Sequence, residues 1–468
     1  MNNSSLASDD LWPGGEAAAL EQGAAHLHVG IWRKTILWMV GAYIVMNSGF
    51  EMVRIPPVGA GIPVGELVLV FSLCVINVLV LLPKMAREVW LLPILVWWGL
   101  SLSRSLLDTA VGGAWAFRDA SQAIESLYLI VGFWLANQTD SLEHFFNWLR
   151  KLLLVLAFYG LLYPIASTLQ EFSPRLRGMS TGHTPTLFFQ VTNTPEMLIW
   201  AVCWLLLERS GRMGVITRTL WASFLLAFSV AFAQSRTTYI AVLGVGAILT
   251  MVMRRMAVRW AVVILLGVAA IGAVAVSGVN LKGRTGHRIS LDYLANHLES
   301  ASGSAESEDV ESAAGGVPLR IGWWRHIFNQ LKSSPENAIF GLGYGMPLTD
   351  FQGPGGITRE PHNSYISVVA RLGVSGLIVW ILMQASLYSA WWRSYRLSRR
   401  MQWTRDQNNL ILLLIFSLLA LVVSIGEGAF EQPFYAIPYY FFFGVVLRYG
   451  KHLRQAAENQ EMAELEET

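Results

Sequence analysis

Long apolar runs, separated by short polar connections, cover most of the chain. A helix needs about 20 apolar residues to cross roughly 30 Å of hydrocarbon, and about twelve runs approach that length. The pattern therefore predicts an all-α polytopic membrane protein with about twelve transmembrane helices. The weakest spans are 119–137, which carries Asp119 and Glu125, and the pair 219–235 and 237–253, which a very short turn joins. The predicted spans lie near residues 35–53, 64–83, 89–107, 119–137, 149–167, 186–207, 219–235, 237–253, 259–277, 363–392, 409–427 and 434–449.

Basic residues fall in every second connection between these spans. If the N-terminus is cytoplasmic and the chain alternates, every cytoplasmic connection is basic, as the positive-inside rule requires. A miscount by one helix would break this alternation downstream. We therefore expect an even number of spans and both termini in the cytoplasm. The basic connections lie near residues 33–34, 84–87, 150–151, 209–218, 254–259, 393–405 and 448–454.

The same alternation leaves one long segment, 278–361, outside the membrane as an extracytoplasmic loop before the tenth helix. Within it, the low-complexity stretch from Glu299 to Gly316 has too few apolar residues to fold. Apolar positions at helical spacing predict an amphipathic helix near 317–334, which would lie on the outer leaflet or on the helix bundle. The full division is a cytoplasmic tail over 1–34, nine helices within 35–277, the loop over 278–361, three helices within 362–450 and a cytoplasmic tail over 451–468.

Composition supports the membrane interpretation and excludes several function classes. Hydrophobic residues make up 54% of the chain and charged residues 14%, against roughly 25% charged in soluble domains. The net charge of +2 says little about partners, and we expect no nucleic acid among them. There is no phosphate-binding glycine loop, no cytoplasmic loop large enough for a nucleotide-sugar domain, and no His, Cys and carboxylate set at metal spacing. We expect neither a cofactor nor a metal.

Two arginines occupy positions that are unusual for a charged side chain. Arg236 lies between two apolar spans, where an arginine costs about 2.5–3.5 kcal/mol at the bilayer centre and usually faces the bundle interior. It could instead reach water from a tight turn. Arg320 shares a helix face with Trp323 and Ile327. Either an anion or an acidic group pairs with it there, or its guanidinium stacks on tryptophan.

Two further candidates follow in the predicted outer loop. His362 precedes Asn363 and Ser364, which are favourable helix N-cap residues. At the membrane edge a histidine can accept a proton from a hydroxyl group, although a structural role is the commoner one. Glycines at 341, 343 and 345 lack the strand and crossover helix of a dinucleotide site. Their spacing favours a flexible loop over close approach of the backbone to a substrate.

Taken together, these motifs resemble the signature region of the O-antigen ligase and polymerase family. The resemblance covers roughly 235–380 in detail. The motifs that carry it are Ser235-Arg236-Thr237, Arg320-Ile321-Gly322-Trp323-Trp324, Pro335-Glu336-Asn337 through Gly341-Leu342-Gly343-Tyr344-Gly345, and His362-Asn363-Ser364-Tyr365 through Arg371-Leu372-Gly373-Val374-Ser375-Gly376.

The resemblance implies a GT-C-like membrane glycosyltransferase in a bacterial inner membrane. Its donor would be an undecaprenyl diphosphate-linked glycan, its acceptor a glycan or lipid-linked glycan, and membrane lipid would surround it. Arg236 and Arg320 would bind the diphosphate, and His362 would activate or orient the acceptor hydroxyl. The further substrate-binding candidates are Asn363, Tyr365, Gly343, Arg175 and Arg177, with Arg371 and His183 in second rank.

The motifs leave three alternatives open. A polymerase of exopolysaccharide or O-antigen repeat units, working beside a flippase and a chain-length regulator, is slightly favoured over an O-antigen ligase. The reason is that the same signature region occurs in many exopolysaccharide systems without a lipid A–core acceptor. A transporter or flippase of lipid-linked glycans should show inverted repeats, and none is evident. A peptidoglycan-type polymerase would require an outer carboxylate, for which Asp292 and Asp350 are available.

Overall fold

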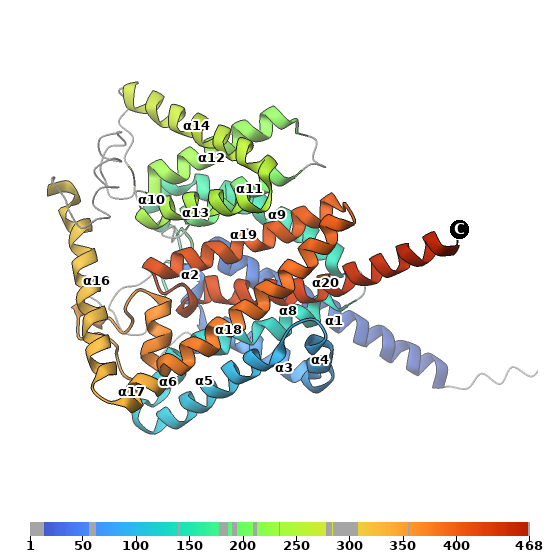
Figure 1. The fold of residues 1–468 in the computed structure, drawn as a ribbon, viewed down its shortest axis with the longest axis horizontal. Helices are drawn as coiled ribbons and strands as arrows, with labels where there is room; N and C mark the ends of the chain where they lie inside the picture. The colour runs from blue at the N-terminus through green and yellow to red at the C-terminus, as the bar shows by residue number, and fades with distance from the viewer. Residues whose placement is uncertain are drawn as a thin grey trace, which may run out of the picture.

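The computed structural model describes residues 14–55, 62–138, 141–176, 186–189, 194–208, 213–233, 235–277, 283, 308–353 and 356–466. The described chain is almost entirely helical, and its longest helices run side by side in one bundle (Figure 1). The helices of the first half are α1 (Gly14–Met46), α2 (Ser48–Glu51), α3 (Val64–Val75), α4 (Val78–Ala86), α5 (Leu91–Gly112), α6 (Ala114–Asp119), α7 (Ser121–Ser126), α8 (Tyr128–Ala136), α9 (Ser141–Leu161), the 3-10 helix η1 (Tyr163–Ile165), α10 (Ala166–Gln170) and α11 (Thr194–Leu207).

The second half supplies the helices that carry the candidate residues. They are α12 (Val215–Ala233), α13 (Arg236–Val252), α14 (Arg254–Val276), α16 (Glu308–Lys332), α17 (Pro335–Phe340), α18 (Ser364–Arg400), α19 (Thr404–Gly426), the 3-10 helix η3 (Ala429–Glu431) and α20 (Pro433–Glu466). Two antiparallel pairs of two-residue strands, β1 (Arg54–Ile55) with β2 (Ile62–Pro63) and β3 (Gln352–Gly353) with β4 (Gly356–Ile357), are the strands among the described residues.

Helices lie in all twelve predicted spans. Among the described residues, four helices are long and apolar enough to cross a membrane by themselves. The number rises to six if each of two bent helix pairs forms one span. One of these pairs corrects the prediction of a single span over 64–83. There, α3 and α4 meet at 92°, and the Asn77 side chain caps α4 by accepting from the Val80 amide. The structure thus confirms an all-α membrane protein, while the count of twelve spans and the GT-C-like arrangement stay predictions.

Helix α20 forms the centre of the bundle. Nearly all its side chains from Pro433 to Leu453 are buried, and it contacts α1, α7, α8, α18 and α19. Its approach to α8 is close because glycines face the contact: Gly132 of α8 lies against the Phe441 carbonyl, and Gly444 of α20 lies against the Leu129 carbonyl. Small residues at helix contacts let backbones pack closely in membranes, where hydrophobic burial drives association little.

Helix α16 packs on the bundle through its apolar face. Ile327 and Leu331 are buried against Leu348, Val369 and Ala370. Of the two expected locations for this amphipathic helix, the bundle is therefore the one that its apolar face contacts. The helix also begins at Glu308, before the expected start at 317. The expectation that residues up to Gly316 do not fold is wrong for the part from Glu308, where alanine and glutamate favour a helix.

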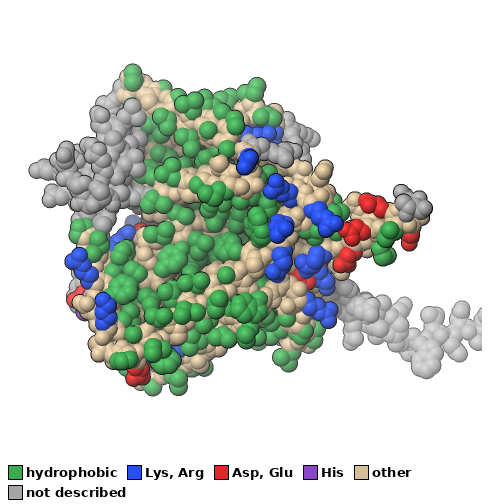
Figure 2. All heavy atoms as spheres, in the orientation of Figure 1, with side chains coloured by type: hydrophobic (Ala, Val, Ile, Leu, Met, Phe, Trp, Pro, Cys, Tyr) green, Lys and Arg blue, Asp and Glu red, His purple; other side chains and the backbone are tan. Residues whose placement is uncertain are grey.

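Basic side chains gather at the end of the bundle where α1 and α20 project (Figure 2). Arg393 donates to the Glu88 backbone carbonyl, Arg454 pairs with the Glu88 carboxylate, and Lys451 lies near Lys84. Helices α16 and α17 lie at the opposite end (Figure 1). Connections that the charge pattern assigned to one side of a membrane thus meet at one end of the molecule.

We expect Gly132→Val to lower the thermal stability of the detergent-solubilised protein. A Cβ at Gly132 would lie 2.0 Å from the Phe441 carbonyl oxygen, and overpacking of this kind costs about 1–3 kcal/mol. The matched control is Gly99→Val, because a Cβ there meets no atom within 4 Å. Equal melting temperatures for the two variants would contradict the close α8–α20 contact.

Candidate functional site

The start of α18 is fastened to the segment between α19 and α20 by consecutive residues. Asn363 is the N-cap: its side-chain oxygen accepts from the Ile366 amide at 3.0 Å, and its Nδ2 donates to the Ile425 carbonyl at 2.8 Å. Ser364 Oγ donates to Glu431 Oε2 at 2.5 Å and accepts from the Phe430 amide. The Asn363 cap thus fixes both the first turn of α18 and the end of α19.

Arg320 and His362 share one carboxylate, that of Glu427, which follows the last residue of α19. Arg320 Nη2 lies 3.3 Å from Glu427 Oε1, and His362 Nδ1 lies 3.2 Å from Oε2. Arg320 Nη1 also donates to the Gly426 carbonyl at 2.7 Å. The three side chains are 31–38% exposed, so they remain accessible to a substrate. Of the two options for Arg320, an acidic partner is the one that occurs.

The charge state of Glu427 determines which histidine nitrogen is free. Burial raises the pKa of Glu427, but the hydrogen bond from His362 and the charge of Arg320 more than offset this effect. Its pKa therefore lies below the ordinary value. An ionised carboxylate only accepts hydrogen bonds, so Nδ1 of His362 carries the hydrogen in this contact and Glu427 leaves Nε2 unengaged. Because its pKa is lowered, the Glu427 carboxylate is ionised at neutral pH and accepts this hydrogen bond.

Aromatic rings and backbone strain fix His362 further. Its ring centroid lies 5.9 Å from that of Trp323, and Trp324 Nε1 donates to the Pro361 carbonyl at 3.0 Å. His362 has a φ of +50°, in the left-handed region that non-glycine residues rarely adopt. Such strain persists only where the surroundings over-determine the conformation, which is common at functional sites.

Arg236 begins α13 beside this cluster. The next residue, Thr237, lies near Gly426 at the end of α19. A Cβ placed on Gly426 would be 3.5 Å from Thr237 Oγ1 and 3.9 Å from Arg320 Nη1. Thr238 Oγ1 donates to Glu196 of α11 at 2.8 Å, which fixes the helix start. The position of the Arg236 side chain lies outside the described part of the structure. The backbone nevertheless places Arg236, Arg320 and His362 around the end of α19.

The remaining predicted residues have mainly structural contacts. Tyr365 donates to the Leu421 carbonyl at 2.9 Å. Arg175 is exposed in an isolated bridge with Thr186, while Arg177 and His183 lie outside the described residues. Asp350 is exposed, and Asp292 also lies outside the described residues. A role for any of them in substrate binding stays a prediction.

The glycine-rich loop is held by tertiary contacts, which corrects the expectation of a flexible loop. Gly343 has a φ of +82°, and a Cβ on it would lie 2.6 Å from both Arg104 Nη2 and Asp108 Oδ2. Its amide donates to the Arg371 carbonyl at 3.1 Å. The partner helix α18 is kinked at Gly373, where φ is +68°. Backbone approach to protein, rather than to a ligand, explains these glycines; substrate binding by Gly343 stays a prediction.

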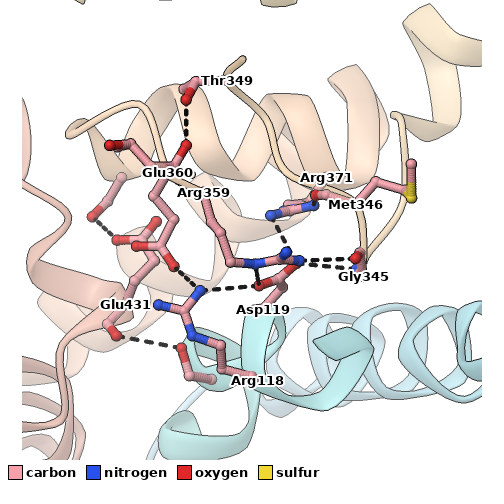
Figure 3. A network of polar contacts seen from close by, with 12 residues as sticks. Arg118, Asp119, Gly345, Met346, Thr349, Arg359, Glu360, Arg371 and Glu431 are labelled. Carbon is pink, nitrogen blue, oxygen red and sulfur yellow. Dashed lines mark hydrogen bonds and ion pairs between the residues drawn. The ribbon is translucent and has the colours of Figure 1, made fainter. Parts of the chain in front are cut away.

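A buried ion network lies beyond this loop (Figure 3). The fully buried carboxylate of Asp119 pairs with Arg118 at 3.3 Å, Arg359 at 2.7 Å and Arg371 at 2.9 Å. It also accepts from the Gly345 amide at 3.1 Å. The cavity inside the network measures about 10 Å³, which is hardly room for one water. The network therefore holds α6, the loop and α18 together and does not enclose a substrate. This gives Arg371 a structural contact.

Sequence reasoning missed Glu427 and the role of Asp119. Glu427 ends a run of apolar residues at the predicted outer membrane edge, a position where an acid is costly and signals a partner. In the sequence, Asp119 is recognisable only as a charge that weakens the predicted span 119–137. Both residues acquire their roles through partners far away in sequence.

Comparison with known families supports the assignment made from the motifs. Residues 221–381, about a third of the chain, match a family model described as O-antigen ligase. A search of curated proteins finds no match. The matched region contains Arg236, Arg320 and His362, whereas Glu427 and Asp119 lie outside it. The resemblance to this family is confirmed.

We expect Asp119→Asn to destabilise the protein by about 3–5 kcal/mol, because removal of one partner leaves buried charges uncompensated. The loss of stability is measured by heating the protein in detergent and quantifying the fraction that remains folded by size-exclusion chromatography. Asp350→Asn is the control, since Asp350 is an exposed carboxylate that takes no part in the network. Unchanged stability of Asp119→Asn would show that the network contributes nothing to the fold.

Proposed function

Because residues 221–381 match a family model described as O-antigen ligase, we propose that the protein is a membrane glycosyltransferase that moves a lipid-linked glycan onto an acceptor glycan. The observation that carries the proposal is the shared Glu427 carboxylate, which brings Arg320 and His362 together beside the start of α13. The donor is an undecaprenyl diphosphate-linked glycan, and the reaction requires neither metal nor nucleotide.

The two arginines suit the leaving diphosphate. A guanidinium presents planar paired donors that match phosphate oxygens, and it remains charged at any working pH. As the bond between the sugar C1 and the diphosphate oxygen breaks, negative charge grows on the diphosphate. Donors already in place stabilise this charge without reorganisation. Arg320 acts from α16 and Arg236 from the start of α13.

His362 suits the acceptor. The acceptor hydroxyl oxygen attacks C1 as the diphosphate departs, and its proton passes to Nε2 of His362. Glu427 holds Nδ1–H and so keeps Nε2 free to accept. Glu427 is in this sense a positioning residue: it sets the tautomer and stabilises the imidazolium that forms.

We place the site at the outer face of a bacterial inner membrane, with both termini in the cytoplasm. Support comes from the basic side chains gathered at the opposite end of the bundle (Figure 2), since cytoplasmic connections are rich in Lys and Arg. A polymerase is slightly favoured over a ligase. Its partners would then be a repeat-unit flippase and a chain-length regulator.

We expect Arg236→Ala, Arg320→Ala and His362→Ala each to lose transfer activity by at least about a hundredfold, the usual scale for a general base or a transition-state donor. The assay uses purified protein, lipid-linked glycan and acceptor in EDTA, with product separated by electrophoresis.

Arg325→Ala is the matched control, because Arg325 is exposed on the same helix. Full activity in all three variants would refute the site, and a wild type inactive in EDTA but active with added metal would refute the metal-independent chemistry.

We expect Glu427→Gln to lower kcat by about tenfold to a hundredfold and to move the acidic limb of the pH–rate profile to lower pH. The shift follows because the imidazolium loses its anionic neighbour. Glu336→Gln, an exposed acid of α17, is the control. A lower rate with an unmoved profile would assign Glu427 a purely structural role.

A further inference from the structure

A second polar site lies at the other end of α19. A cavity of about 510 Å³ opens between α9, α11 and the start of α19. Its polar lining includes Asn147, Arg150, Glu208, Arg405 and Asn408. This volume is in the range of small-molecule sites, whereas the space inside the Asp119 network is not.

The cavity and the candidate active site are separated by the length of one membrane. Thr404, the first residue of α19, lines the cavity, while Gly426, the last, accepts from Arg320. The 23 residues of α19 rise about 35 Å, and the hydrocarbon core of a bilayer is about 30 Å thick. If the active site lies at the outer face, the cavity therefore opens at the cytoplasmic face.

The charges of the lining favour an anion. Arg150 pairs with Glu208 at 3.0 Å through Nε and donates to Asn147 at 3.1 Å through Nη1. These contacts use two of the five N–H donors of its guanidinium. Arg405 is 64% exposed, and its 3.9 Å pair with Glu143 is weak. Among the residues that line the cavity, two arginines face one carboxylate, that of Glu208, because Glu143 does not line it. The lining itself therefore carries a net positive charge.

The rest of the lining is apolar and aromatic. Phe146, Trp204, Leu207 and Leu412 form this wall. Trp204 Nε1 is buried and has no hydrogen-bond partner among the described residues. An indole N–H is a donor only, and buried donors usually have an acceptor. A wall of this kind is unnecessary for a free inorganic ion, but it suits the glycerol and upper acyl region attached to a phosphate.

We propose that this cavity binds the phosphate head group of an anionic phospholipid from the cytoplasmic leaflet. Basic pockets between transmembrane helices on the cytoplasmic side are suited to such head groups. The proposal rests on the membrane orientation of the proposed function but not on the transfer reaction. Free phosphate shares the head-group chemistry, so the test includes it.

The test is native mass spectrometry of the purified full-length protein, titrated with phosphatidylglycerol or with phosphatidylcholine. We expect Arg150→Gln/Arg405→Gln to bind phosphatidylglycerol about tenfold more weakly than wild type. The matched control is Arg396→Gln/Arg400→Gln, which removes the same charge from exposed positions outside the cavity. Arg405→Gln alone, at an exposed position, should show part of the loss in a folded protein.

The possible results distinguish a lipid site from diffuse surface charge and from a free-ion site. Tighter binding of phosphatidylglycerol than of phosphatidylcholine, lost in the cavity variants and kept in the control, supports the proposal. Equal loss in the control indicates diffuse surface charge and overturns it. Displacement of the lipid by millimolar inorganic phosphate overturns it in favour of a free-ion site. His362→Ala should retain lipid binding, so a failure of the transfer chemistry is distinguishable from a failure here.

Discussion

Glu427 joins segments that are remote in sequence. Its carboxylate receives Arg320 from α16 and His362 from the start of α18, and it extends from the end of α19 beside Thr237 of α13. Without this acid, Arg320 and His362 would have no common partner to hold them in a defined geometry. The arrangement depends on the end of α19 being fixed, and Asn363 and Ser364 provide that by binding on either side of Glu427.

The buried ions around Asp119 stabilise the frame that presents this site. A buried ion pair is seldom worth more than an apolar contact of the same size, but it is costly to break and demands defined geometry. Arg359 and Arg371 approach one carboxylate from the loop and from α18, and the Gly345 amide completes its coordination. These contacts therefore fix the position of the loop that leads into His362 relative to α18.

Much of the fold could be predicted because apolar runs are a local signal. The helices at 363–392 and 409–427 were located in this way, and both are long enough to cross a membrane. The 92° break between α3 and α4 was not predicted, since the Asn77 cap interrupts a run that remains apolar. The same distinction between local and tertiary signals applies to the candidate site. The position of Arg320 on an apolar face indicated an anionic partner, but which acid it meets is set by tertiary packing more than a hundred residues away.

The glycine-rich loop carries part of the motif by which the chain resembles the family, and its glycines have a structural explanation. At Gly343 any side chain would collide with Arg104 and Asp108, and at Gly373 it would collide with the Ile339 carbonyl. Their positive φ values also strain any other residue, so both positions favour glycine for structural reasons alone. These motif glycines are thus explained by how the loop packs against α5 and α18. For the proposed glycosyltransferase, selectivity for one glycan over another therefore has to come from residues outside this loop.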